Sequence, residues 1–155
     1  MYTIVEALTP ELILIVRSLF QEYESSIGVD LSFQGFAKEL EELPGKYAPP
    51  AGGLFVAFIN DRPVGCVALR PLVMERGAEL KRLYSRPNAR GKGLGVALTE
   101  EAIRRGREAG YRLIRLDTLS TMKDAQRLYR RLGFNEIPPY TFNPIPGTTY
   151  MQLDL

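Results

Sequence analysis

The 155-residue sequence contains no histidine, no tryptophan and a single cysteine, Cys66. One cysteine excludes an internal disulfide, and the absence of histidine removes the commonest metal ligand, so we expect no metal site. Cys66 lies in an apolar, strand-like segment, where a buried and inert thiol is the expected role. The chemistry of this protein should therefore depend on neither a disulfide framework nor a histidine-bound metal.

The sequence also has little net charge and no long apolar run. Its 20 Lys and Arg against 18 Asp and Glu give a net charge of +2, which argues against a nucleic-acid-binding surface. The longest apolar run near the N-terminus, residues 12–16, is far shorter than the roughly 20 residues that span a bilayer. No basic segment precedes it. We expect a cytoplasmic protein with no nucleic-acid or membrane partner, folded as one domain over residues 1–155.

The most informative stretch runs from residue 79 to residue 110. It predicts a strand over residues 79–85, a glycine-rich turn over residues 90–95, and a helix that ends at Gly110. Glycines without a Cβ let the turn approach a ligand closely. The first amides of the helix have no intrahelical partner, and the helix dipole favours negative charge there. The turn therefore predicts a site for phosphate oxygens. It contributes Arg90, Gly91, Lys92, Gly93 and Gly95.

Two common phosphate-binding motifs do not fit this turn. A P-loop reads GxxxxGK[ST], and neither Lys-Ser nor Lys-Thr follows these glycines. A dinucleotide-binding turn reads GxGxxG, whereas the glycines here are spaced GxGxG and the preceding strand is strongly charged. The ligand must therefore be identified from the neighbouring residues.

The segment Arg90-Gly91-Lys92-Gly93-Leu94-Gly95 resembles the acyl-CoA-binding motif of the GNAT superfamily of N-acetyltransferases, Arg/Gln-x-x-Gly-x-Gly/Ala after a strand. The preceding LKRLYSRP and the later LYRRLGF are also typical of that family. The resemblance covers residues 54–155 in element order and is specific over residues 79–134. It implies transfer of an acetyl group from acetyl-CoA to a primary amine, either a small molecule or an amino-acid-like acceptor, by direct attack in a ternary complex.

The resemblance also implies how coenzyme A binds. In that fold the strand before the turn and the strand at residues 112–118 splay apart, and the gap admits the pantetheine arm. Backbone groups of Leu83 and Ser85 would contact the pantetheine and the acyl carbonyl, and amides of residues 90–96 would hold the pyrophosphate. The implied cofactor-binding residues are Leu83, Tyr84, Ser85, Arg90, Gly91, Lys92, Gly93, Leu94, Gly95, Val96, Ser120, Ala125 and Tyr129.

The helix predicted over residues 122–132 departs from the family at its start. Relatives often place an asparagine there to hydrogen-bond the pantetheine, and this chain has Met122 instead. Ser120 or Thr121 is the candidate to make this hydrogen bond in place of the asparagine. Which side chain contacts the pantetheine here is therefore undecided, whereas the implied backbone contacts are unaffected.

Acyl transfer to an amine requires that the amine lose a proton and that the departing thiolate gain one. The resemblance gives the second role to Tyr129, whose alternative is to anchor its helix against the sheet as an amphipathic side chain. Glu79 matches the position of the family's glutamate base. Its alternative is a structural ion pair with Lys81 or Arg82. Glu75 could serve as the base instead through a water.

The acceptor pocket is expected over residues 25–36 together with Tyr140 and Phe142, which says only that the pocket is partly aromatic. The identity of the amine is open, and so is a homodimer, which is common among relatives. The alternative function is an acyl-CoA-binding sensor or regulatory module without efficient turnover.

The remaining patterns predict an α/β fold with a mixed, mostly antiparallel central sheet of about seven strands, splayed at its centre, with helices on both faces. Thr9 and Pro10 begin the first helix and Gly28 ends it. On the central helix, two Glu–Arg pairs are spaced i,i+4 on a solvated face. These pairs are Glu100 with Arg104 and Glu101 with Arg105. The other predicted elements are strands at residues 2–6, 54–59, 64–69, 134–137 and 148–153 and a second helix at residues 32–43.

Overall fold

Over residues 1–73 and 76–155, which are the residues that the structure describes, this computed structural model contains one seven-stranded sheet in the order β1-β2-β3-β4-β5-β7-β6. Neighbouring strands are antiparallel except β4 and β5, which run parallel. The predicted mixed, mostly antiparallel sheet is therefore confirmed. The strands are β1 (Tyr2–Glu6), β2 (Gly53–Ile59), β3 (Arg62–Pro71), β4 (Gly77–Ser85), β5 (Leu113–Thr118), β6 (Asn135–Ile137) and β7 (Thr149–Asp154). The helices are α1 (Pro10–Ile27), α2 (Phe36–Glu42), α3 (Leu94–Glu108) and α4 (Lys123–Arg131). The 3₁₀ turns are η1 (Leu31–Gln34), η2 (Gly45–Tyr47) and η3 (Pro87–Ala89).

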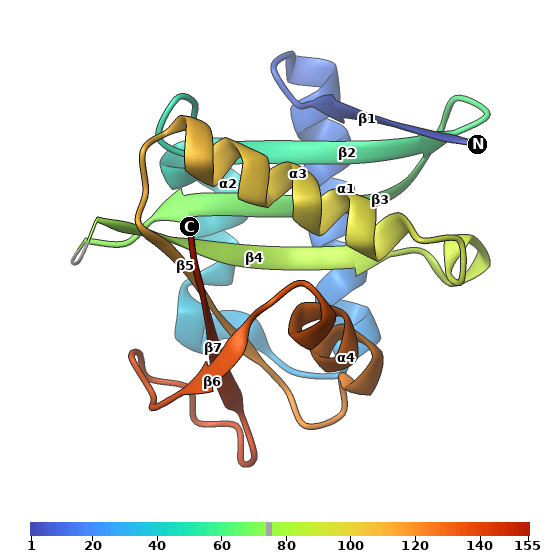
Figure 1. The fold of residues 1–155 in the computed structure, drawn as a ribbon. Coiled ribbons are helices and arrows are strands. Elements are labelled where there is room, and N and C mark those ends of the chain that lie inside the picture. Colours follow the sequence, from blue (N-terminus) through green and yellow to red (C-terminus); the bar gives the residue numbers. More distant parts are fainter. Residues whose placement is uncertain (74–75) are drawn as a thin grey trace.

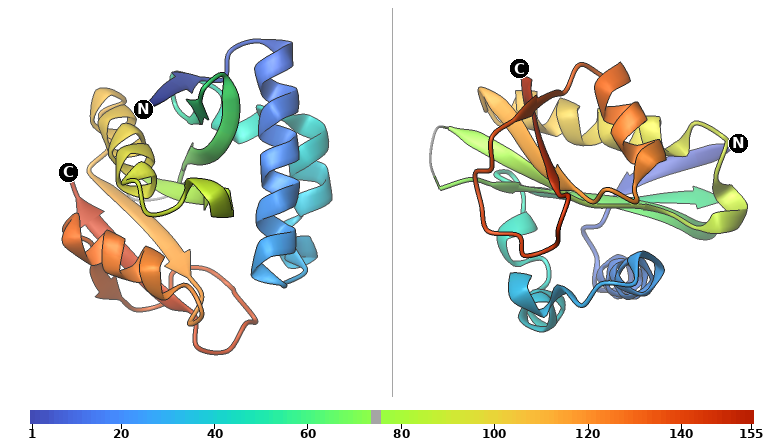
Figure 2. Two further views of the ribbon diagram at one scale, coloured as in Figure 1. Left: turned by 90° about the vertical axis from the view of Figure 1, so that its right-hand side faces the viewer. Right: turned by 90° about the horizontal axis from the view of Figure 1, so that it is seen from below.

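Helices cover both faces of the sheet, as predicted (Figures 1 and 2). Helices α1 and α2 lie on one face, and α3 and α4 lie on the other. Each pair of helices buries an apolar core against the strands. Leu19 and Phe20 belong to the α1 side, and Leu98 and Ile114 belong to the α3 side. No helix in the described part of the chain combines the length and the apolar character that crossing a bilayer requires.

Capping residues set the bounds of α1, and a glycine separates η1 from α2. The hydroxyl of Thr9 accepts a hydrogen bond of 3.2 Å from the amide of Leu12 at the start of α1, and Gly28 ends that helix in the left-handed conformation. Both ends are confirmed. The single second helix predicted over residues 32–43 is wrong, because Gly35 adopts a φ of 70° and divides the segment into η1 and α2.

The two central strands part after a short paired segment. Strands β4 and β5 pair only from Gly77 opposite Leu113 to Glu79 opposite Arg115. Beyond Glu79, β4 continues to Ser85 and pairs with β3 alone. The edge of β4 that faces β5 therefore carries backbone groups without a strand partner, which is the predicted splay.

A bulge in β4 changes the side-chain alternation just beyond this point. The β3–β4 register shifts between Cys66 and Ala68, and Arg82 adopts a left-handed φ of 61°. An extra residue in a strand breaks the strict alternation of side chains between the two faces. The side chains of Lys81 and Arg82 consequently both reach the α1–α2 face, where each contacts Gln34.

Arg82 fastens the η1–α2 segment to the sheet. Its guanidinium donates two hydrogen bonds to the carboxylate of Glu39 at 3.0 and 2.9 Å and one to Gln34 Oε1 at 2.8 Å. The guanidinium carbon also lies 5.0 Å from the ring centre of Phe36. Because the Arg82 side chain is only 1% exposed, its charge depends on these partners.

We expect Glu39→Leu to lower the free energy of unfolding by about 3 to 5 kcal/mol, because it leaves the buried charge of Arg82 without its carboxylate partner. Urea denaturation measures the change. Glu101→Leu is the matched control, since Glu101 pairs with the exposed Arg104 side chain and should cost no more than about 1 kcal/mol. Equal losses in the two variants would show that the Arg82 pair does not hold the η1–α2 segment.

Candidate active site

The glycine-rich turn follows η3 and passes directly into α3. Gly91 and Gly93 adopt left-handed φ values of 79° and 76°, which residues with a Cβ rarely adopt. Gly93 caps α3 without a side-chain hydrogen bond, and a Cβ built on either glycine would meet nothing within 4 Å. The turn therefore presents backbone to open space, and the first amides of α3 have no intrahelical partner. This is the geometry of an anion site.

Gly95 lies within the helix, where its missing side chain also serves packing. Because α3 begins at Leu94, Gly95 lies within its first turn and not in the connecting loop. A Cβ on Gly95 would lie 2.9 Å from Cδ1 of Leu128 on α4. The absence of a side chain therefore allows α4, which carries Tyr129, to approach the start of α3. The side chain of Leu94 is buried in the core, so only its backbone can contact a ligand.

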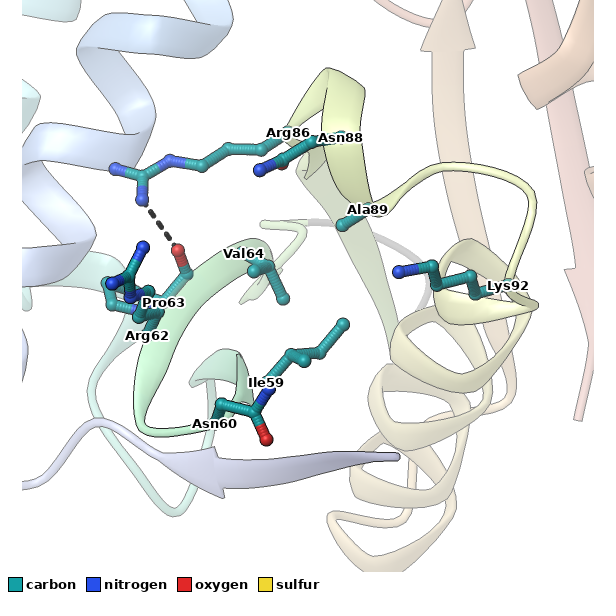
Figure 3. Close-up of a pocket in the computed structure, with 9 residues that line it drawn as sticks. All are labelled: Ile59, Asn60, Arg62, Pro63, Val64, Arg86, Asn88, Ala89 and Lys92. Atoms are coloured by element: carbon teal, nitrogen blue, oxygen red, sulfur yellow. Dashed lines mark hydrogen bonds between the residues drawn. The ribbon is translucent and has the colours of Figure 1, made fainter.

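The two cationic side chains of the turn point to different places. Arg90 turns back and donates a hydrogen bond of 3.0 Å from Nε to the carbonyl of Ser85. The side chain of Lys92 lines a cavity of about 420 Å³ on the β2–β3 side of the turn, together with Arg62 and Arg86 (Figure 3). Anion binding at the start of α3 therefore depends mainly on backbone amides.

At the end of β4, the predicted cofactor-binding residues present backbone groups, and not side chains, to a ligand. Leu83 packs into the α3–α4 core. The ring of Tyr84 turns toward α1, where its hydroxyl donates a hydrogen bond of 3.2 Å to Glu22. The Ser85 carbonyl already accepts the hydrogen bond from Arg90. These three residues can therefore offer mainly main-chain groups to a ligand in the gap between β4 and β5.

Tyr129 lies on the α3–α4 side of the sheet and is 5% exposed. Its ring centre is 5.6 Å from that of Phe134. Its hydroxyl makes no hydrogen bond to any described residue. Burial raises the pKa of Tyr129 well above its ordinary value, so the hydroxyl is protonated at neutral pH. A protonated hydroxyl with no internal acceptor can donate to a ligand.

Glu79 is 4% exposed and makes two kinds of contact. Arg70, its cross-strand neighbour on β3, donates a hydrogen bond of 3.0 Å from Nε, and the hydroxyl of Tyr140 donates one of 2.6 Å. Burial favours a higher pKa for Glu79, but the charges of Lys81 and Arg70 outweigh it, and the pKa lies below the ordinary value. Glu79 is therefore an ionised carboxylate at neutral pH. Its ion pair is with Arg70, and not with Lys81 or Arg82 as the structural alternative predicted.

Two groups of predicted residues remain: Glu75, the other candidate base, and the residues at and before the start of α4. Glu75 lies outside the described residues. Ser120 is exposed and lies beside Gly147, and Ala125 packs into the α3–α4 core. Met122 turns inward and accepts a hydrogen bond of 3.7 Å at its sulfur from the hydroxyl of Thr118. The Met122 side chain therefore belongs to the interior of the site.

Asp117 on β5 was not among the residues predicted from the sequence. Its Oδ2 accepts a hydrogen bond of 3.1 Å from Asn143, and its Oδ1 lies 4.0 Å from Nζ of Lys81. Burial raises the pKa of Tyr140, and the charge of Glu79 and, less strongly, that of Asp117 add to this rise. Burial and then the charge of Asp117 raise the pKa of Tyr150. Asp117 therefore lies among tyrosines where β4 and β5 part. Its signal in the sequence was that it is the only acidic residue of its strand.

Comparisons with known proteins agree with this geometry. The Acetyltransferase (GNAT) family matches residues 15–134 of the chain. An uncharacterized N-acetyltransferase of Schizosaccharomyces pombe is 43% identical over 140 residues, which cover 90% of this chain and 86% of that protein. A GNAT-family acetyltransferase of Staphylococcus aureus has a similar structure, with a TM-score of 0.81, 20% identity and 99% of each chain covered. The yncA protein of Salmonella typhimurium, solved with its cofactor acetyl-CoA, has a TM-score of 0.68 with 20% identity over 99% of this chain and 93% of that one.

This chain therefore belongs to the GNAT family of acetyltransferases. It is an N-acetyltransferase, an enzyme of the acyltransferase class, as expected.

We expect Gly93→Asp to reduce acetyl-CoA affinity at least 100-fold, because the carboxylate would stand beside the amides that bind phosphate. Isothermal titration with acetyl-CoA measures the change. Gly110→Asp is the matched control, since Gly110 has a φ of 83° and open space at its Cβ but lies beyond the opposite end of α3. Unchanged affinity in a folded Gly93→Asp variant would show that the turn does not bind the cofactor.

Proposed function

We propose that the chain transfers the acetyl group of acetyl-CoA to a primary amine, of a small molecule or an amino-acid-like acceptor, by direct attack within a ternary complex. The observation that carries this proposal is the parting of β4 and β5 beyond Glu79. The gap has an amide-lined turn near one end and the protonated hydroxyl of Tyr129 on one side. The acetyl-CoA bound to yncA supports the choice of cofactor.

The residues around the gap fit acetyl-CoA. The amides from Gly93 to Val96 can bind a diphosphate, and hydrogen bonds to a charged group contribute about 1.5 to 3 kcal/mol each. The unpaired edge of β4 from Leu80 to Ser85 can hydrogen-bond the amides of a pantetheine arm in the manner of a neighbouring strand. When bound there, acetyl-CoA supplies the acetyl thioester.

Two protein groups handle the protons of the reaction. The Tyr129 hydroxyl donates its proton to the departing sulfur, and burial keeps that proton in place until the sulfur can accept it. Glu79 accepts the proton that the amine gives up, directly or through a water. Because its lowered pKa makes Glu79 a weak base, it passes this proton on to solvent, and it also orients the amine through a charged hydrogen bond. Overall, a carbon–nitrogen bond forms and a carbon–sulfur bond breaks. An acceptor that starts as an ammonium ion loses two protons, of which one restores the Tyr129 hydroxyl and the other is released to solvent.

We expect Tyr129→Phe to lower kcat by roughly 10- to 1,000-fold, within the usual span of general acid catalysis, and to change acetyl-CoA affinity less than about twofold. Steady-state kinetics and isothermal titration measure the two quantities. Tyr111→Phe is the control, because its hydroxyl bonds only to the carbonyl of Ala51, beyond the far end of α3. If Tyr129→Phe turns over as fast as this control, Tyr129 is not the acid.

The function itself is tested by measuring coenzyme A release from acetyl-CoA in the presence of alkylamines, amino acids and peptides with free N-termini. We expect at least one class to stimulate release well above the rate of hydrolysis, with a matching mass increase of the acceptor by one acetyl group. Tight binding of acetyl-CoA with no stimulated release by any amine would overturn the proposal.

A further inference from the structure

A second cavity lies on the α1–α2 face of the sheet, where β4 and β5 part. It encloses about 20 Å³, which is room for one water molecule or one ammonium group. Its polar lining comes from Asp117, Gln34, Asn143 and Tyr23. The apolar wall includes Ile27, Val29, Leu31, Phe33, Leu119 and Ile145.

The carboxylate of Asp117 is not saturated by its neighbours. A carboxylate can accept about four hydrogen bonds, and this one accepts a single bond of 3.1 Å, from Asn143 to Oδ2. The nearest cation to Oδ1 is Nζ of Lys81 at 4.0 Å, beyond hydrogen-bond distance. The Asp117 side chain is 10% exposed, so water satisfies it only in part. Among the described residues, Oδ1 therefore has no hydrogen-bond donor within bonding distance, in a largely enclosed site.

The cations around Asp117 have other partners. Nζ of Lys81 donates to Gln34 Oε1 at 3.1 Å, and Arg82 binds Glu39 and the same Gln34 oxygen. Arg70 pairs with Glu79. Arg115 donates from Nε to Gln152 and makes further contacts. A donor that enters the cavity would therefore meet Oδ1 of Asp117 as its available charged acceptor among the described groups.

We propose that Asp117 selects the acceptor: its Oδ1 binds the ammonium group of a primary amine. Because the cavity holds the ammonium group alone, the hydrocarbon substituent extends outward against the apolar side chains that line the cavity. The acceptor class is then an alkylamine or arylalkylamine without a carboxylate of its own. This inference rests on the proposed function and specifies the substrate of the same site.

The position of Asp117 relates this binding to the reaction. Asp117 lies on β5 two residues beyond Arg115, the last residue that pairs with β4. An ammonium group held there lies at the mouth of the gap that the acetyl thioester would enter. A carboxylate substituent on the acceptor would bring a second negative charge next to Asp117, and repulsion between the two would disfavour it.

The test measures binding without turnover, using isothermal titration on enzyme saturated with coenzyme A, which lacks the acetyl group. The probes are 3-methylbutylamine and 2-phenylethylamine, each with the alcohol of the same skeleton. We expect the wild type to bind each amine at least 10-fold more tightly than its alcohol. Asp117→Asn should weaken amine binding about 10- to 100-fold and leave alcohol binding within about twofold, because only the charged hydrogen bond is lost.

Two further variants serve as controls. Asp124→Asn removes a carboxylate that is 96% exposed on α4 and should leave every affinity unchanged. Asn143→Ala keeps the charge of Asp117 and removes only its hydrogen-bond donor, so this variant should retain the preference for the amine even if Asp117→Asn does not fold. A wild type or an Asn143→Ala enzyme that binds amine and alcohol equally would overturn the inference, as would tighter binding of aspartate than of either amine.

Failure of this inference differs from failure of the proposed function. If amines are acetylated but Asp117→Asn has the wild-type KM for them, the function stands and the role of Asp117 is wrong. If amine binding depends on Asp117 but no amine stimulates coenzyme A release, the ammonium site stands and the transferase reaction proposed for it is wrong.

Discussion

The site depends on one constraint, which is that β4 and β5 stop pairing after three residues. A parallel strand pair normally satisfies the backbone of both strands along their length. Here β4 extends from Leu80 to Ser85 with β3 on one side only. Backbone groups left without a partner are costly unless water or a ligand satisfies them. The parting therefore both opens the sheet and leaves on its edge the groups that an extended amide-containing ligand can satisfy.

The bulge at Arg82 makes this opening compatible with a stable sheet. It lets Lys81 and Arg82 project to the same face, where Gln34 and Glu39 bind them. The η1–α2 segment is thereby attached to the strand that forms one edge of the gap. A buried charge network is costly unless each member is paired, and it then favours one arrangement over alternatives. The same residues that stabilise the segment consequently fix a wall of the acceptor cavity.

Local signals in the sequence were sufficient for most of the fold. Thr9 and Gly28 mark the ends of α1 because capping depends on a few neighbouring residues. Long-range contacts were not readable in the same way. Arg105 was expected to pair with Glu101 one turn earlier, yet its guanidinium reaches Glu6 on β1 at 2.6 Å. For the same reason Asp117 escaped notice, since its importance comes from residues on β4 and on the segment before β7.

The two faces of the sheet carry different parts of the proposed chemistry. Tyr129, the proposed proton donor to sulfur, lies on the α3–α4 face, and Glu79 and Asp117 lie on the face of α1 and α2. A continuously paired sheet would separate these groups by a layer of hydrogen-bonded backbone. Only where β4 and β5 part can one ligand contact both faces. The acyl donor and the amine can therefore meet between an acid on one side and carboxylates on the other, which explains why both kinds of residue gather at the gap.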